Sequence, residues 1–243
     1  MSKELHFFTE SNREVPALTT AQMRSRPHCD ARDRTESFPN DGERRTQFGR
    51  DGVGFTRRRL ATSEDRSTGR NGRQWGGGIT AARHLANRMA KVELCLASPD
   101  KLSEVTAWQR KIFQSTAGKE VGFRSLDGEP VRLIVDALIG YSLQSAPQGV
   151  FADLIRWANG AGAPIISLDV PSGVDSTTGL SPGEFIRPSW TMTLALPKLG
   201  LAKSEVSEIV LADIGIPEET YRRIGVEYIS PFDHRFRVPL FVR

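Results

Sequence analysis

Hydrophobic positions in the second half of the chain follow a repeating order of strand, loop and helix. Residues 131–136 (VRLIVD) form an apolar run that closes on Asp136, and residues 164–169 (PIISLD) form a second run that closes on Asp169. Between them, apolar residues at 150, 154, 155 and 158 recur at helical spacing. The pattern predicts a βαβ unit, whose right-handed crossover makes the two strands parallel. Both acids are then expected at the carboxyl edge of one sheet, where open α/β sheets bind ligands.

The same pattern predicts further elements on both sides of this unit. Three glycines at 76–78 lead into a helix over residues 79–88, residues 91–96 alternate as a strand, and a second helix covers residues 102–113. Residues 191–196 and 209–212 are interpreted as strands, 197–200 as a turn, and the chain after Pro217 as a short helix and a terminal arm. This alternation predicts an α/β fold, a three-layer α/β/α sandwich with a mostly parallel sheet.

Residues 24–75 break the pattern. They contain thirteen Arg, no Lys and eight Asp or Glu, a balance of 13 − 8 = +5, whereas the whole chain sums to 33 − 29 = +4. We interpret residues 1–243 as a single domain in which residues 24–75 are anomalous and poorly ordered. Because the remainder sums to −1, it carries no charge pattern typical of nucleic-acid binding. An arginine-rich arm that binds RNA is the alternative interpretation of the segment itself.

Length and cysteine usage bound the class of protein. A chain of 243 residues accommodates one α/β domain and leaves no room for a second catalytic domain. No apolar run of about 20 residues and no signal-like segment is found, so we expect a cytoplasmic protein that does not enter a membrane. Cys29 and Cys95 lie far apart without metal-ligand spacing, which predicts free thiols in a reducing compartment.

Four motifs occur together in the second half of the chain: VDALIG (135–140), LDVPSGVDSTTG (168–179), TLALPKLGL (193–201) and ADIGIP (212–217). With the PALTTAQM opening (16–23) and the GGGITAARHLANR helix (76–88), they resemble the YjeF N-terminal family, the NAD(P)H-hydrate epimerases. The resemblance implies a Rossmann-like domain that interconverts the R and S hydrates of NADH and NADPH. A separate dehydratase would then return these hydrates to the coenzyme.

Carried over position by position, the resemblance also implies site residues. Asp136 and Ser172 match the ligands of a potassium ion, and Asp169 matches the catalytic, substrate-binding acid. The implied substrate-binding positions are, besides Asp169, Gly76, Gly77, Gly78, Gly140, Tyr141, Ser142, Leu143, Gln144, Ser145 and Ala146.

The residue types suit these roles. A monovalent cation takes oxygen ligands, which a carboxylate and a hydroxyl supply. A partly desolvated carboxyl group can protonate a departing hydroxyl beside a ring nitrogen and later accept a proton. Taken without the resemblance, Asp136 is equally a helix cap or loop acid, Ser172 a turn serine, and the glycines a helix entry without a ligand.

The phosphate loop of the family, Asn-Asn-Gly-Gly-Asp, is altered in this chain. The aligned residues 73–77 are Arg, Gln, Trp, Gly and Gly. Residues 70–76 (RNGRQWG) can be encoded CGG AAC GGG CGG CAA TGG GGG, and the same bases read one position later give Gly-Thr-Gly-Gly-Asn-Gly. We therefore interpret residues from about 25 to 75 as translated out of frame relative to the family, which predicts a sheet that lacks one inner strand. Resequencing the gene across the glycine codons tests this hypothesis.

Three classes of function are compatible with these observations. The first is epimerisation of hydrated NADH or NADPH; the alternative is a catalytically impaired relative that acts as a nucleotide- or RNA-binding scaffold. A Rossmann oxidoreductase is disfavoured, because no GxGxxG followed by an acid about 20 residues later is present. The expected partners are the hydrated coenzyme, a separate dehydratase and a second copy of the chain as a homodimer, with neither membrane nor nucleic acid.

Overall fold

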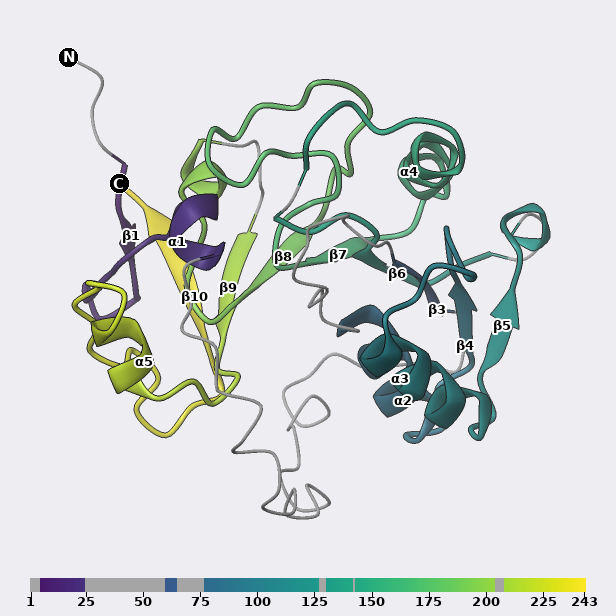
Figure 1. The fold of residues 1–243 in the computed structure, drawn as a ribbon, viewed down its shortest axis with the longest axis horizontal. Helices are drawn as coiled ribbons and strands as arrows, with labels where there is room; N and C mark the ends of the chain where they lie inside the picture. Colours follow the sequence, from purple (N-terminus) through teal and green to yellow (C-terminus); the bar gives the residue numbers. More distant parts are fainter. Residues whose placement is uncertain (1–4, 25–59, 65–76, 127–129, 142, 204–207) are drawn as a thin grey trace.

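One ten-stranded sheet forms the centre of the computed structural model, which describes residues 5–24, 60–64, 77–126, 130–141, 143–203 and 208–243 (Figure 1). The strand order is β2-β1-β10-β9-β8-β7-β6-β3-β4-β5. The strands are β1 (Phe7–Phe8), β2 (Glu14–Val15), β3 (Leu60–Glu64), β4 (Val92–Cys95), β5 (Lys119–Val121), β6 (Leu133–Ala137), β7 (Ile165–Leu168), β8 (Trp190–Leu194), β9 (Glu208–Ala212) and β10 (Arg237–Val242). The neighbouring strands β9, β8, β7, β6, β3, β4 and β5 all pair in parallel. Strands β10, β1 and β2 extend the sheet beyond β9 with antiparallel pairs. The predicted α/β fold with a mostly parallel sheet is confirmed.

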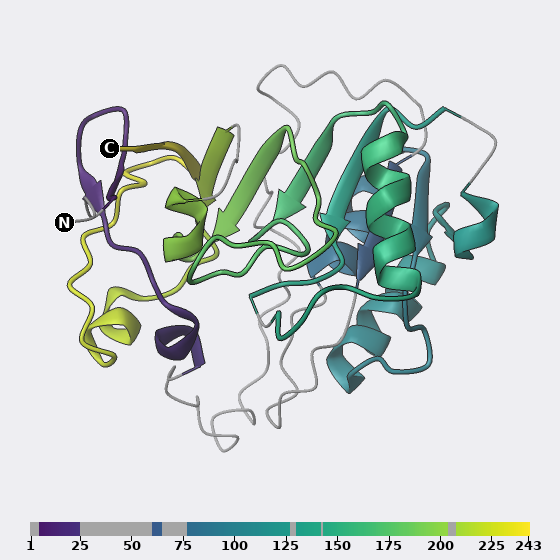
Figure 2. The ribbon, with the colours of Figure 1, turned by 90° about the horizontal axis from the view of Figure 1, so that it is seen from above.

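Helices cover both faces of the parallel part of the sheet. Helices α2 (Gly77–Ala86) and α3 (Glu104–Gln114) lie on one face and α4 (Val150–Gly160) on the other, as the two views show (Figures 1 and 2). Strand β4 shows why, because successive side chains of a strand point to opposite faces. Leu94 belongs to the core cluster of α2 and α3, whereas Cys95 belongs to the cluster of α4. The three-layer arrangement therefore follows from alternate burial.

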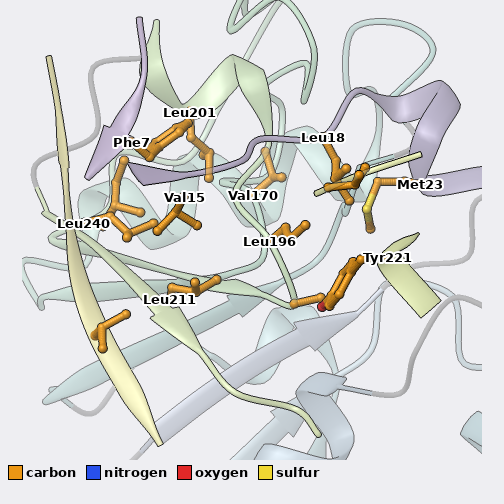
Figure 3. Packing of buried hydrophobic residues seen from close by; sticks show 14 of the residues in the cluster. Phe7, Val15, Leu18, Met23, Val170, Leu196, Leu201, Leu211, Tyr221 and Leu240 are labelled. Atoms are coloured by element: carbon orange, nitrogen blue, oxygen red, sulfur yellow. The ribbon is translucent and has the colours of Figure 1, made fainter. Parts of the chain in front are cut away.

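The antiparallel end of the sheet joins the two ends of the described chain. Helix α1 (Thr20–Arg24) follows the β1–β2 hairpin, and α5 (Glu218–Arg222) precedes β10. Figure 3 shows Leu18 and Met23 from the N-terminal segment beside Val170 and Leu196 from the central loops, all members of one buried cluster. The N-terminal residues are thus part of the core rather than an appendage.

Strand β3 corrects one expectation from the sequence. Leu60–Glu64 pairs in parallel with both β4 and β6, so the described sheet has an inner strand at the place where we expected none. The physical reason is that ladder hydrogen bonds are backbone interactions: a strand here satisfies the facing N–H and C=O groups of both neighbours. The remaining predictions for residues 25–59 and 65–76, including their poor order, lie outside the described residues. The reading frame of the segment stays a prediction.

The other differences concern short or terminal elements. The terminal arm contains β10, which pairs antiparallel with β9, and Lys119–Val121 is a three-residue edge strand that no periodicity indicated. Cys95 is a buried free thiol, as predicted, while Cys29 lies outside the described residues. Among the helices that the structure describes, none has the length and apolar character needed to cross a membrane.

Candidate active site

Asp136 and Asp169 lie at the same edge of the sheet. Strands β6 and β7 are parallel neighbours with Asp136 opposite Ser167, and Asp169 directly follows the last residue of β7. Both acids are therefore at the carboxyl ends of adjacent inner strands, as the βαβ pattern predicted. Helix α2 begins near this edge too. A Cβ built on Gly77, its first residue, would lie 4.0 Å from Cδ1 of Leu168, the last residue of β7.

The Asp136 carboxylate is buried among neutral hydrogen-bond donors. Ser172 donates from its hydroxyl to Oδ1 at 2.5 Å and from its backbone N–H to Oδ2 at 3.0 Å. The Ser167 hydroxyl donates to Oδ2 at 2.7 Å, and the Leu138 N–H donates to Oδ1 at 3.2 Å. Burial raises the pKa of Asp136 above its ordinary value, and the hydrogen bonds from Ser172, Ser167 and Leu138 only partly offset that effect. No ion pair to Asp136 is formed within the described part of the chain.

Ser172 joins the ends of the two strands. Its hydroxyl accepts a hydrogen bond from the Ile139 N–H at 2.7 Å while donating to Asp136, so one side chain connects the loops after β6 and β7. The next residue, Gly173, has φ +92°, and a Cβ there would lie 2.3 Å from the Glu184 carbonyl oxygen. Only glycine meets both conditions, which explains the glycine after Ser172.

Asp169 has a different environment, because it forms an ion pair with Lys198. The Lys198 ammonium contacts Asp169 Oδ1 and also donates to the Leu194 carbonyl oxygen at 3.0 Å. The Lys198 side chain is fully buried, whereas 17% of the Asp169 side chain is exposed. The pair therefore holds a cation inside the protein while part of the Asp169 side chain stays exposed to solvent.

The N-terminal segment closes over the same loops. Leu18 forms a parallel bridge with Lys198, its N–H donating to the Pro197 carbonyl oxygen at 2.8 Å. The Thr20 hydroxyl lies 2.7 Å from the Ser176 hydroxyl, which donates to the Tyr141 carbonyl oxygen at 3.1 Å. These contacts connect the start of α1 with the loops after β6, β7 and β8.

The family model described as YjeF-related protein N-terminus matches residues 67–200, which is more than half of the chain and contains both acids, Ser172 and Lys198. The chain belongs to this family. Its YjeF N-terminal domain thus includes the strand-end loops described above, and the family predicted from the sequence motifs is confirmed.

Two relatives and one solved structure place the chain more closely. The NAD(P)H-hydrate epimerase of Dehalogenimonas lykanthroporepellens is 41% identical over 94% of this chain and 94% of its own length. The bifunctional NAD(P)H-hydrate repair enzyme Nnr of Salinibacter ruber is 38% identical over 60% of this chain, which spans only 31% of that enzyme. The crystal structure of yeast ynu0 has a TM-score of 0.63 and 18% identity, and covers 80% of this chain and 82% of its own. That structural likeness supports the fold alone.

The structure brings several of the predicted site residues of this YjeF N-terminal domain together. Asp136, Ser172 and the loop from Gly140 meet at the sheet edge, and Gly77 and Gly78 form the first turn of α2 beside Leu168. Ala146 lies against Gly183, because a Cβ added to Gly183 would be 2.9 Å from the Cβ of Ala146. Tyr141 and Leu143 are partly buried, whereas Gln144 and Ser145 are exposed. Gly76 and Ser142 lie outside the described residues.

Two residues of the site were missed in the sequence. Lys198 was interpreted only as part of a turn, and Ser167 only as a strand residue. Each had a signal, because Lys198 is the one charge within the apolar run TLALPKLGL and Ser167 interrupts the apolar run PIISL. A single polar residue within a buried stretch indicates a partner, but sequence spacing does not identify that partner.

Proposed function

We propose that this chain is an isomerase, an NAD(P)H-hydrate epimerase that interconverts the R and S forms of hydrated NADH and NADPH for nucleotide repair. The observation that carries the proposal is the 41% identity, over 94% of both chains, with a protein named for this activity. The arrangement of Asp169, Asp136 and Ser172 at the carboxyl edge of the sheet supports it. The alternative, a scaffold without turnover, is not favoured by this relative.

Asp169 is the proposed catalytic residue. The two epimers differ at a hydroxylated carbon next to the ring nitrogen, so inversion requires the carbon–oxygen bond to break and to re-form on the opposite face. In this scheme the carboxyl group of Asp169 protonates the departing hydroxyl, which leaves as water. The resulting carboxylate faces the positive charge on the ring and then accepts a proton from the water that adds to the other face. The proton given and the proton recovered balance.

Substrate binding is proposed for the residues around this acid. The first turn of α2, with Gly77 and Gly78, presents backbone N–H groups beside Leu168, and free N–H groups at a helix start favour a pyrophosphate. The loop of Gly140, Tyr141, Leu143, Gln144, Ser145 and Ala146 is proposed to cover the ligand. Gly76 and Ser142 are proposed to contribute as well, although they lie outside the described residues.

One potassium ion is the proposed cofactor, and the residues present fit it. The Asp136 carboxylate and the Ser172 hydroxyl are oxygen ligands, and the Ile139 carbonyl oxygen lies 3.3 Å from that hydroxyl. Among the described residues the carboxylate meets only neutral donors, and burial raises its pKa, so a cation would offset a costly buried charge. When bound, the ion would supply positive charge near the pyrophosphate.

The other expected partners remain proposals. The bifunctional repair enzyme of Salinibacter ruber is about three times as long as the part of it that matches this chain, which is 31% of its length. The name of that relative, a bifunctional repair enzyme, supports a dehydratase as a partner in the same repair. A homodimer, a cytoplasmic location and the absence of a nucleic-acid partner are part of the same proposal.

The purified R hydrate of NADPH tests the function. We expect the chain to form the S hydrate faster than the uncatalysed background, with R and S forms separated by chromatography. Asp169→Asn should lower kcat by about 10² to 10⁴-fold, the usual contribution of acid–base catalysis. Asp100→Asn is the matched control, because Asp100 is an exposed acid in the loop after β4. A wild-type rate equal to background would contradict the proposal.

A further inference from the structure

Lys198 is an unusual residue for the interior of the sheet edge. Its side chain is fully buried, and its ammonium contacts Asp169 Oδ1, the Leu194 carbonyl oxygen at 3.0 Å and the Thr193 hydroxyl at 3.5 Å. A lysine is rarely buried without a specific partner, because removing an ammonium from water is costly. Asp169 is the partner that carries the opposite charge.

Stability alone does not account for this pair. Buried ion pairs can often be replaced by apolar residues of similar volume with little loss, because desolvation consumes most of the Coulombic attraction. The neighbours of Lys198 would suit such a replacement, since Leu196 and Leu201 on either side are buried in the same apolar cluster. The charge is therefore best explained by its effect on Asp169.

Asp169 is held at one oxygen only. Its Oδ1 meets both the Lys198 ammonium and the Leu194 N–H at 3.2 Å, and no hydrogen bond to Oδ2 is formed by the residues that the structure describes. The backbone is constrained as well, with φ +71° and the Asp169 N–H donating to the Met192 carbonyl oxygen at 2.8 Å. A non-glycine residue in this left-handed region is strained, and such strain is frequent where a side chain must be aimed.

The lysine is itself held from two sides. Leu18 bridges to the Lys198 turn through hydrogen bonds with Pro197 and Leu199, of 2.8 and 3.2 Å. On the other side the Gly200 N–H donates to the Ser176 carbonyl oxygen at 2.9 Å, and a Cβ on Gly200 would lie 2.4 Å from the Asp175 carbonyl oxygen. The ammonium is thus positioned by the N-terminal segment and by the loop that follows Asp169.

We propose that Lys198 is the positioning residue for Asp169: it fixes Oδ1, so that Oδ2 is presented to the ligand, and it supplies a counter-charge from within the chain. The inference rests on the proposed function for its kinetic consequence, but the orientation of the Asp169 carboxylate can be observed without turnover. Lys198 acts through Asp169 and, being fully buried, is not expected to contact the substrate itself.

A double-mutant cycle on the full chain tests this coupling. We expect Lys198→Met to lower kcat for the R hydrate of NADPH by about 10 to 100-fold, since a misplaced catalytic group costs up to that factor. KM should change by less than about threefold, because ligand contacts remain. In the Asp169→Asn background the same lysine change should cause no further loss, since residues that act as a unit are not additive.

Lys203→Met is the matched control, because Lys203 is an exposed lysine just after the same turn, and it should keep wild-type kcat. Losses that multiply in the double variant, or a Lys198→Met protein with wild-type kcat, would overturn the proposal. Crystal structures of the wild type and of Lys198→Met decide it independently of activity. A displaced Asp169 carboxylate in the variant supports positioning, whereas an unchanged carboxylate refutes it. Absent turnover with a displaced carboxylate would refute the proposed function alone.

Discussion

The two strand-end acids of this chain occupy opposite electrostatic environments within one sheet edge. Asp136 is buried among neutral donors from Ser172, Ser167 and Leu138, and burial raises its pKa. Asp169, two positions beyond the residue that faces Asp136 in the ladder, pairs with the buried ammonium of Lys198. One acid has its cation in the chain, and the other meets none among the described residues.

The difference shows that a strand ending in an acid does not define what that acid does. The cation near Asp169 is contributed by the loop after β8, and an ion from solution is proposed for Asp136. The first acid is therefore suited to a fixed orientation, while the second is suited to a charge that depends on the ionic composition of the medium. Three predictions test this contrast, beginning with the loop that holds both acids in place.

Gly173→Ala should have the largest effect on stability. Gly173 directly follows Ser172, which binds Asp136, and it packs closely against the backbone at Glu184. The new Cβ would lie 2.3 Å from a backbone oxygen, in a residue whose φ is +92°. Steric overlap and left-handed strain together should cost about 3 to 5 kcal/mol of unfolding free energy, measured by urea denaturation.

Gly225→Ala is the control for that prediction. Gly225 also has a left-handed φ of +73°, but nothing lies within 4 Å of its added Cβ. It should lose only about 1 to 2 kcal/mol, the cost of the backbone conformation itself. Equal losses in the two variants would mean that close approach at Gly173 is not what holds the loop.

Asp136→Asn should change how stability depends on pH and on the cation. Because the folded-state pKa of Asp136 is raised, the native protein binds the proton more tightly than the unfolded chain. That contribution is fully present below the ordinary pKa of about 4 and is lost as pH rises through the raised value. In sodium buffer, the stability of the wild type relative to the variant should therefore fall with increasing pH.

Potassium should reduce this loss in the wild type. Replacing sodium with potassium at equal ionic strength and neutral pH is expected to stabilise the wild type by about 1 to 2 kcal/mol, following mass action at a partly saturated site. The Asn variant should respond equally to the two ions. A wild type that does not distinguish potassium from sodium would contradict the proposed ligand role of Asp136 and Ser172.

The smallest effect is expected at Cys95, which resembles Asp136 because burial raises its pKa too. Like Asp136 it is a buried acid, and burial followed by the Glu120 charge raises the pKa of its thiol to about 11. At pH 8 almost no thiolate forms, so alkylation of Cys95 by iodoacetamide should require unfolding. Peptide mapping by mass spectrometry with and without urea measures this, and rapid labelling of the native protein would show that the β4 face opens readily.

Much of this architecture could be predicted from hydrophobic periodicity. Helix α4 and strands β6 and β7 have strong patterns, and the proximity of Asp136 to Ser172 followed from placing DALIG and DVPSG at one sheet edge. Strands β3, β5 and β10 were not predicted as strands, because short segments gain their structure from backbone pairing with neighbours that are distant in sequence. The N-terminal contribution to the core was missed for the same reason.

The sequence alone determined the family, the alternation of strands and helices along the chain, and the identity of both strand-end acids, because these depend on local pattern and on motifs. Only the tertiary structure decided that Lys198 pairs with Asp169 while neutral hydroxyl and N–H groups surround Asp136. An ion pair depends on distance and burial in three dimensions, and its two members lie 29 positions apart in the chain. The chemistry of each acid is therefore set by the loops that fold around it.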